Sequence, residues 1–356
     1  MPDVVVSRRA VLARGSAALA AALLPVSPLL PPDAPVPARP PRPAPRPEDP
    51  LDVVVVGAGS AGLSAALVLG RSRRRVVVLD GGPPRNAPAH AAYGVFTRDG
   101  TPPLDLLAHA RADLDPYPSV SVRAARATGV SGSDGAFAVA LDDGPALHAR
   151  KVLLATGVAD DLPDVPGVAE LWGGDLFHCP YCHGWEVRDR PLGVWANGPR
   201  AAEVTVLLRG WSDRLTVLTD GPSEIDGADA ATLAALGVPV RQDPVAALEH
   251  DDGALRAVRF ADGSRLALGG ILVSVPQRER SGLPAALGCE TTETGHVATG
   301  PSGETSVPGV YAAGDLATLM QAVTLVAAHG AQAAYALNRI LAHEEADRLA
   351  LAATAR

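Results

Sequence analysis

The sequence predicts an α/β protein made of two doubly wound, Rossmann-like domains, one of which is inserted into the other. Three observations predict this fold class. A valine run at 53–56 leads into a glycine-rich loop, a strand and loop recur at 192–201, and a strand near the C-terminus ends in Gly314-Asp315. Continuous β-branched runs are typical of buried parallel strands, which need helices on both faces of their sheet.

The composition suits such a protein and excludes several others. The chain has 356 residues, enough for two domains, and 47% of them are hydrophobic. Its formal net charge of −8 argues against a nucleic-acid surface. Three cysteines cannot form a disulfide scaffold for a chain of this length. We expect the isolated Cys289 to be a small packing residue.

Residues 1–50 are expected to lie outside the fold. Ser7-Arg8-Arg9-Ala10-Val11-Leu12 resembles a twin-arginine export signal, and a short apolar run follows at 15–24. That run is too short to span a bilayer, which takes about 20 residues, but it suits a signal-peptide core. Residues 25–50 are proline-rich and predict a semi-rigid tether. We expect export and no membrane span in the mature chain, or a cytoplasmic protein if the start codon is mis-assigned.

The first glycine-rich loop has the full context of a dinucleotide-binding site. A helix is predicted at 63–69 and a strand at 75–79, ending at Asp80. In Gly57-Ala58-Gly59-Ser60-Ala61-Gly62, the three glycines allow a tight turn, close approach to a pyrophosphate and close helix packing. The amides that open the helix, at Ser60 and Ala61, suit phosphates. Asp80, about 20 residues further on, suits a ribose hydroxyl.

Two later motifs resemble the flavoproteins that carry two dinucleotide-binding domains. One is Ala155-Thr156-Gly157, which follows a predicted strand at 152–154, and the other is Gly314-Asp315. The resemblance implies that the first loop binds the FAD pyrophosphate and that Asp315 binds the ribityl chain. It also implies that Gln321-Ala322-Val323, where a helix is predicted to begin, lies beside the flavin ring. An ordinary helix N-cap is the alternative role for Asp315.

A pair of cysteines predicts the chemistry. Cys179-Pro180-Tyr181-Cys182-His183 contains a Cys-x-x-Cys, which can open and close a disulfide reversibly. Its place between the first FAD segment and a central domain resembles low-molecular-weight thioredoxin reductases. The Cys-Pro-Tyr-Cys-His-Gly form, with the stretches 84–90 and 97–103, is more similar to the dithiol oxidases of the gliotoxin and holomycin type.

This resemblance implies a role for each residue of the pair. Cys182 would face the flavin, Cys179 would meet the substrate, and His183 would transfer protons, which an imidazole can do near neutrality. It also adds Gly81, Arg85 and Asn86 to the expected cofactor-binding residues.

Other interpretations of the pair stay open at this stage. Cys-x-x-Cys-His is also the attachment sequence of c-type haem. A zinc site would need four ligands, whereas Cys179, Cys182 and His183 supply three. A structural disulfide across so small a loop would give little entropic stabilisation. His183 could be a purely structural histidine.

The central domain predicts a weakened second nucleotide site. After the strand 192–195, the three glycine positions are occupied by Ala196, Gly198 and Ala201. Alanine at the first position disfavours a turn with positive φ. The next strand, 215–218, is followed by Asp220, which would repel a 2′-phosphate. After Asp220, the first arginine is Arg241. We therefore do not expect NADPH to bind, whereas NADH stays open.

These expectations combine into one hypothesis. The FAD domain would comprise 51–164 and 276–345, with an NAD(P)-type domain inserted at 165–275 and a tail at 346–356. We expect an FAD-dependent oxidase that forms a disulfide in a small-molecule dithiol and reduces oxygen to hydrogen peroxide, without metal or nucleic acid. The alternatives are an NAD(P)H-dependent thioredoxin reductase-like disulfide reductase and a flavin redox sensor. A homodimer is implied by the resemblance alone.

Overall fold

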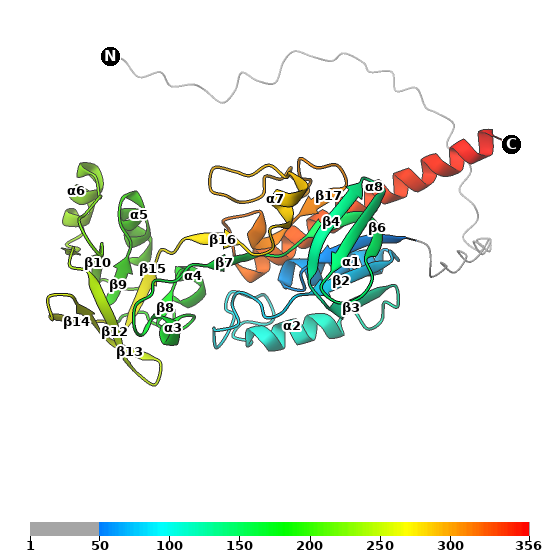
Figure 1. Cartoon of the computed structure of the whole chain (residues 1–356). Helices are drawn as coiled ribbons and strands as arrows, with labels where there is room; N and C mark the ends of the chain where they lie inside the picture. Colours follow the sequence, from blue (N-terminus) through cyan, green and yellow to red (C-terminus); the bar gives the residue numbers. More distant parts are fainter. Residues whose placement is uncertain (1–49, 356) are drawn as a thin grey trace, which may run out of the picture. The chain divides into compact units, whose positions relative to one another are not determined.

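The computed structural model describes residues 50–355 (Figure 1). The predicted export signal and nearly all of the tether therefore lie outside the described residues. Within 50–355, two sheets, each with its own helices, are joined by a short two-stranded sheet. No helix in this part of the chain is both long and apolar enough to cross a membrane.

The first sheet has seven strands and contains the predicted valine strand at its centre. Its order is β3-β2-β1-β6-β5-β4, and β17 pairs with β6. Strands β1, β2, β3, β6 and β17 are parallel, whereas β4 and β5 are antiparallel. The strands are β1 (Leu51–Val56), β2 (Val76–Asp80), β3 (Val120–Ala124), β4 (Ala127–Ser133), β5 (Ala136–Leu141), β6 (Leu147–Leu154) and β17 (Val310–Ala312).

The valines of β1 alternate between two cores. Val53 and Val55 pack in one cluster, and Val54 and Val56 pack in another. This alternation follows from the two-residue period of a strand, and it explains why every residue of the run is apolar. Cys289 is buried in the second cluster, which confirms its predicted packing role.

Four helices and a 3-10 turn accompany this sheet. They are α1 (Ser60–Arg71), α2 (Pro103–Ala112), α7 (Leu283–Leu287), α8 (Val323–Thr354) and η1 (Gly314–Leu316). Helices α1 and α8 are in close contact, since a Cβ on Gly330 would lie 2.0 Å from the carbonyl oxygen of Ala61. Both helices begin beside the glycine loop or the Gly314-Asp315 turn, so they bring these two motifs together.

Two helix boundaries differ from the sequence-based expectations. Helix α1 begins at Ser60 rather than at 63, so the glycine loop leads into it without a spacer. Helix α8 continues to Thr354, so the tail predicted at 346–356 is mostly helical. The expected boundary at 345 coincides instead with the last anchoring contacts of α8. Its Glu344 pairs with the buried Lys151 and Arg150, and Glu345 pairs with Arg74.

The second sheet is fully parallel and belongs to the inserted domain. Its order is β11-β10-β9-β15-β8, and a separate antiparallel sheet, β12-β13-β14, follows β11 in the chain. The strands are β8 (Leu176–Phe177), β9 (Leu192–Trp195), β10 (Leu215–Leu218), β11 (Val240–Arg241), β12 (Val245–Asp251), β13 (Ala254–Phe260), β14 (Arg265–Ala267) and β15 (Gly270–Val273). Its helices are α3 (Val168–Leu171), α4 (Pro180–His183), α5 (Pro199–Leu208) and α6 (Gly227–Ala235).

The chain leaves and re-enters the first domain through two short strands. Strands β7 (Val158–Asp160) and β16 (Gln277–Glu279) pair with each other in antiparallel register and run side by side (Figure 1). Helix α7 (Leu283–Leu287) follows β16 and packs on the first domain's core. The β7–β16 pair is therefore the only strand pairing that holds the two connections together in the described part of the chain.

Candidate active site

A single cavity collects most of the predicted site residues. It has a volume of about 530 Å³. It is lined by residues of the glycine loop, of the 81–93 loop, of the 155–160 segment, of the Cys-x-x-Cys region and of the turn before α8. The predicted residues that line it are Gly57, Gly59, Ser60, Ala61, Gly81, Arg85, Asn86, Ala155, Thr156, Gly157, Gly314, Asp315, Gln321, Val323, Cys182 and His183.

The glycine loop has the geometry that its sequence predicts. Gly57 has φ +117°, and a Cβ there would lie 2.2 Å from the carbonyl oxygen of Ala155. A Cβ on Gly62 would lie 1.9 Å from the oxygen of Gly57, so this glycine permits close packing of helix and strand. Gly59 faces open space, with no atom within 4 Å of an added Cβ. No side chain caps the N-terminus of α1, so its amides are available to an anion.

Three predicted cofactor-binding residues do not line this cavity: Gly62, Asp80 and Ala322. Gly62 acts through helix packing, and Ala322 is the N-cap residue of α8. The carboxylate of Asp80 accepts hydrogen bonds from Arg111 Nη2 at 2.6 Å and from the Gly82 amide at 3.1 Å. Asp80 therefore shapes the 80–82 turn in this structure.

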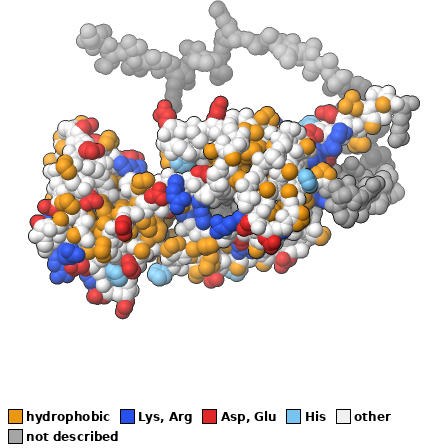
Figure 2. Space-filling view, viewed as in Figure 1, with side chains coloured by type: hydrophobic (Ala, Val, Ile, Leu, Met, Phe, Trp, Pro, Cys, Tyr) orange, Lys and Arg blue, Asp and Glu red, His pale blue; other side chains and the backbone are white. Residues whose placement is uncertain are grey.

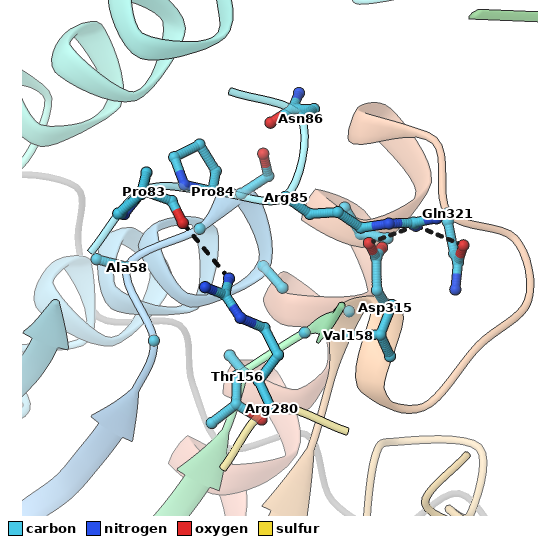
Figure 3. Close-up of a pocket in the computed structure, with 18 of the residues that line it drawn as sticks. Ala58, Pro83, Pro84, Arg85, Asn86, Thr156, Val158, Arg280, Asp315 and Gln321 are labelled. Atoms are coloured by element: carbon cyan, nitrogen blue, oxygen red, sulfur yellow. Dashed lines mark hydrogen bonds and ion pairs between the residues drawn. The ribbon is translucent and has the colours of Figure 1, made fainter. Parts of the chain in front are cut away.

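Three arginines line the cavity: Arg85, Arg126 and Arg280. Asp142, Asp160 and Asp315 line it as well, and Arg85 pairs with two of them, so Arg126 and Arg280 are the arginines that suit a diphosphate. Arg280 reaches across to the carbonyl oxygen of Pro83, and Arg85 points toward Asp315 and Gln321 (Figure 3). In the space-filling view, Lys and Arg side chains gather near the middle of the visible face (Figure 2).

The side chain of Asp315 lies at the edge of this lining. Its Oδ2 is 3.2 Å from Arg85 Nη1. Burial raises the pKa of Asp315, and the charge of Arg85 opposes that rise. Gly314 has a positive φ of +80°, and this backbone conformation directs Asp315 toward the cavity.

These features fit a bound FAD. The volume lies within the usual range for cofactor sites, roughly 300–1,000 Å³. Gly57, Gly59 and the start of α1 would hold the pyrophosphate, and Asp315, with the residues that open α8, would hold the ribityl and ring portions. The cysteine pair lies at the same cavity, where two-electron chemistry with a flavin would take place.

The two cysteines form a disulfide but occupy different positions. Cys182 lines the cavity, whereas Cys179 is not among the lining residues and is the N-cap of α4. Pro180 occupies the first turn of this short helix, where its missing amide costs nothing. The arrangement gives the disulfide one sulfur toward the cavity and one available to a different partner.

His183 is held next to Cys182 by aromatic rings. Its imidazole stacks on Phe177 at 6.0 Å and meets Tyr93 edge-on at 6.5 Å. Its Nδ1 atom is buried and has no hydrogen-bond partner. Burial lowers the pKa of His183, a hydrogen bond with the Gly173 backbone opposes this, and the charge of His90 lowers it further. The lowered pKa favours the neutral imidazole, which can accept a proton.

A second histidine precedes the pair. His178 also lines the cavity, and its ring packs on Trp172 at 5.7 Å. Burial lowers the pKa of His178 to about 4, and the charge of Arg85 lowers it too.

On the outer side, Tyr181 and Trp185 are 69% and 65% exposed, which leaves apolar surface next to the cysteines.

The second nucleotide loop keeps one glycine, Gly198, but differs from the first loop in its turn and in its free amides. Ala196 does not have the positive φ that Gly57 has, and Pro199 opens α5 without an N–H group. The side chain of Asn197 accepts the amide hydrogens of Gly198 at 2.9 Å and Glu224 at 2.8 Å, and it donates to Pro222 O at 2.9 Å. Asn197 thus ties this loop to the loop after β10.

Asp220 and Arg241, the acid after β10 and the first arginine that follows it, are both engaged in other contacts. Asp220, at φ +53°, accepts the amide hydrogen of Val245 at 2.7 Å. Arg241 pairs with Asp243 at 2.9 Å, and its guanidinium stacks on Phe260 at 3.9 Å. No residue of 196–201 lines the large cavity.

Sequence reasoning missed several residues of the site. His178, Tyr93, Asp160, Arg126 and Arg280 all line the cavity. His178 stands next to Cys179 in the sequence, so its place at the site could have been predicted. The others lie outside any motif, and only folding brings them together. Among residues 50–355, no group of three His, Cys, Asp or Glu side chains is arranged to hold a metal ion.

The chain is similar to known proteins over most of its length. Residues 51–334 match the family described as Pyridine nucleotide-disulphide oxidoreductase. The chain is 34% identical over 307 residues to "Thioredoxin reductase sirT" of Leptosphaeria maculans, covering 81% of this chain and 93% of the relative. It is 32% identical over 289 residues to "Thioredoxin reductase tcpT" of Claviceps purpurea, covering 77% and 88%.

Solved structures give the same result. The crystal structure of HlmI has 44% identity and a TM-score of 0.82, with 86% of this chain and 97% of that chain covered. An oxidoreductase from Agrobacterium tumefaciens has 36% identity and a TM-score of 0.77, with 83% and 99% covered. The chain therefore belongs to the pyridine nucleotide-disulphide oxidoreductase family and is a thioredoxin reductase-like oxidoreductase that acts on sulfur groups.

Proposed function

We propose that this chain is an FAD-dependent dithiol oxidase, which converts a small-molecule dithiol into its disulfide with oxygen as electron acceptor. The observation that carries the proposal is the cavity wall that Cys182 and His183 share with the glycine loop. One dithiol and one oxygen molecule give one disulfide and one hydrogen peroxide, so atoms and electrons balance.

The residues of the pair divide the thiol exchange between them. A substrate thiolate attacks Sγ of Cys179, which breaks the Cys179–Cys182 bond and releases Cys182 as a thiolate. The second substrate thiol attacks the mixed disulfide, which frees the substrate disulfide and reduces Cys179. Neutral His183 accepts a proton from a reacting thiol. FAD, when bound, supplies the two-electron transfer from the reduced pair to oxygen.

The second nucleotide loop supports oxygen rather than NADPH as the other reactant. Helix N-termini bind phosphates through their free amides. In α5 the Gly198 amide is used by Asn197, and Pro199 has none. Asp220 would also repel a 2′-phosphate. NADH lacks that phosphate, so this repulsion does not apply to it.

A disulfide reductase that uses NADH or NADPH is the second candidate. The intact five-stranded parallel sheet of the inserted domain favours it, and so do the relatives that are named thioredoxin reductases. A fold can persist after its ligand is lost, however, so the sheet alone does not decide between the two.

Anaerobic stopped-flow mixing separates the candidates. We expect dithiothreitol to bleach the flavin absorbance, while NADPH does not. Rapid bleaching by NADPH or NADH would overturn the oxidase proposal. Steady oxygen consumption with matching hydrogen peroxide release would then support an enzyme over a redox sensor, which would turn over once.

We further propose that the mature protein is a homodimer exported by the twin-arginine route. Light scattering of the purified protein tests the first statement. Mass analysis of the protein from the extracytoplasmic fraction tests the second and locates the cleavage site. A monomer, or a chain found only in the cytoplasm, would contradict the respective statement.

A further inference from the structure

The guanidinium of Arg85 is fully engaged inside the cavity. Its Nε and Nη2 atoms donate to the two carboxylate oxygens of Asp160 at 2.7 and 2.6 Å, which makes the pair bidentate. Nη1 donates to Gln321 Oε1 at 2.6 Å and lies 3.2 Å from Asp315 Oδ2 (Figure 3). The Arg85 and Asp160 side chains are only 11% and 5% exposed.

These contacts reach both connections between the domains. Asp160 ends β7, and its register partner on β16 is Gln277. Gln277 lies 3.4 Å from Asp160 through its Nε2 and exchanges two hydrogen bonds with Gln321, at 2.8 and 3.1 Å. One arginine on the 81–93 loop thus joins β7, β16 and the turn before α8.

The contacts of Arg85 are strong because they are buried and because the guanidinium is planar. A bidentate arginine–carboxylate pair fixes orientation as well as distance. When one partner of a buried pair is removed, the other charge is left uncompensated, which is strongly unfavourable. The two connections have little else to fix them, because β7 and β16 pair over three residues each.

A second ion pair at the same connections offers a control. Arg278 of β16 and Asp161, the residue after β7, form an ion pair at 2.8 Å, and they are 62% and 47% exposed. Exposed pairs of this kind contribute little to stability. Of the two pairs, only Arg85 and Asp160 line the cavity.

We propose that Arg85 is a positioning residue: through Asp160 and Gln277 it holds the two interdomain connections so that Cys182 and His183 stay at the cavity wall. The proposal rests on the proposed function only in that Cys182 exchanges electrons with the flavin, in either direction. It holds equally for an oxidase and for a reductase.

The test compares Arg85→Met, Arg85→Lys and Arg278→Met in the FAD-loaded protein. A misplacement of about 1 Å can cost roughly 10²-fold in rate, so we expect Arg85→Met to slow flavin bleaching by dithiothreitol by about that factor. Arg85→Lys keeps the charge without the bidentate geometry and should fall in between. Arg278→Met should stay within about twofold of the parent, as expected for an exposed pair.

Two further readouts separate positioning from general stability. Reoxidation of dithionite-reduced flavin by oxygen does not involve the cysteines, so it should be unchanged in every variant. Hydrogen exchange in peptides that cover 156–162 and 275–281 should accelerate in Arg85→Met and not in Arg278→Met.

Three outcomes would overturn the proposal. One is unchanged bleaching in FAD-loaded Arg85→Met, and another is slower bleaching without faster exchange at β7 and β16. Loss of FAD from both Arg85 variants and from Asp160→Asn would also overturn it, since Arg85 would then be a cofactor-binding residue. Failure of the parent protein to react with dithiothreitol would instead count against the proposed function.

Discussion

The two nucleotide loops of this protein follow similar strands, but they differ in which backbone amides are free to bind a ligand. At 57–62, glycines hold the turn, no side chain caps α1, and the loop lines the cavity. At 196–201, the Asn197 side chain accepts the amide hydrogens of Gly198 and of Glu224, and Pro199 has no amide hydrogen to donate. The inserted domain contributes to the cavity through residues within 172–183 rather than through its nucleotide loop. A shared fold does not imply a shared ligand, because the ligand depends on a few free donors.

The largest effect is expected at Cys182. Cys182→Ser should abolish flavin reduction by dithiols while FAD stays bound, because the only sulfur in the cavity wall is lost. Stopped-flow absorbance and the ratio of flavin to protein absorbance measure both quantities. Cys289→Ser is the control, since Cys289 is buried away from the cavity. Flavin reduction that persists in Cys182→Ser would show that electrons reach the flavin by another route. The nucleotide loop at 196–201 would then be examined first.

The next effect is expected at His183. A general base contributes about 10²–10⁴-fold, so His183→Asn should slow dithiol oxidation within that range. Burial lowers the pKa of His183, so the neutral base persists as the pH falls below 6.5. The parent rate constant should therefore keep its plateau below pH 6.5 before it declines. A decline centred above pH 6.5 would contradict this role.

A matched pair of loop variants tests the comparison directly. Gly57→Ala should weaken FAD binding about 10- to 100-fold, because strained backbone costs roughly 1–3 kcal/mol. The added Cβ would also lie 2.2 Å from the Ala155 oxygen. Ala196→Gly at the equivalent position should leave FAD content and dithiol oxidation unchanged. Equal losses in the two variants, measured by fluorescence titration with FAD, would remove the distinction between the loops.

A smaller effect concerns stability at acid pH. The pKa of His178 is about 4 in the folded protein, below its ordinary value of 6.5. Between these values the unfolded chain binds the extra proton, so stability falls as the pH decreases from 6.5 toward 4. His178→Gln should flatten this part of the curve of melting temperature against pH. The exposed His148→Gln is the control; identical slopes in all three proteins would contradict the assignment.

The smallest effect is expected at Asp220. Asp220→Ala removes the acceptor of the Val245 amide and should cost about 1–2 kcal/mol of unfolding free energy in urea. Dithiol oxidation should not change. If the parent reacts with NADH and the variant does not, Asp220 holds a ribose, and the second loop is a working site after all.

The sequence alone predicted the sheets, the glycine loop and the cysteine pair well because each depends on local patterns. Val53–Val56 forms the central strand, and Leu215–Leu218 forms β10 as predicted. It did not predict that α8 continues to Thr354, because the contacts of Glu344 and Glu345 that anchor this helix form only after folding. It also gave no hint that Asp80 would pair with Arg111 across 31 residues.

What the sequence determined by itself was the kind of chemistry: a flavin-type loop, a Cys-x-x-Cys and a histidine beside it. These motifs are short, and their residues are neighbours in the chain, so backbone geometry fixes them. Only the tertiary structure decided which sulfur lines the cavity, and that Arg85 binds Asp160 and Gln321 across distant segments. Those outcomes depend on burial and on charges that meet only after folding, and no local pattern in the chain carries them.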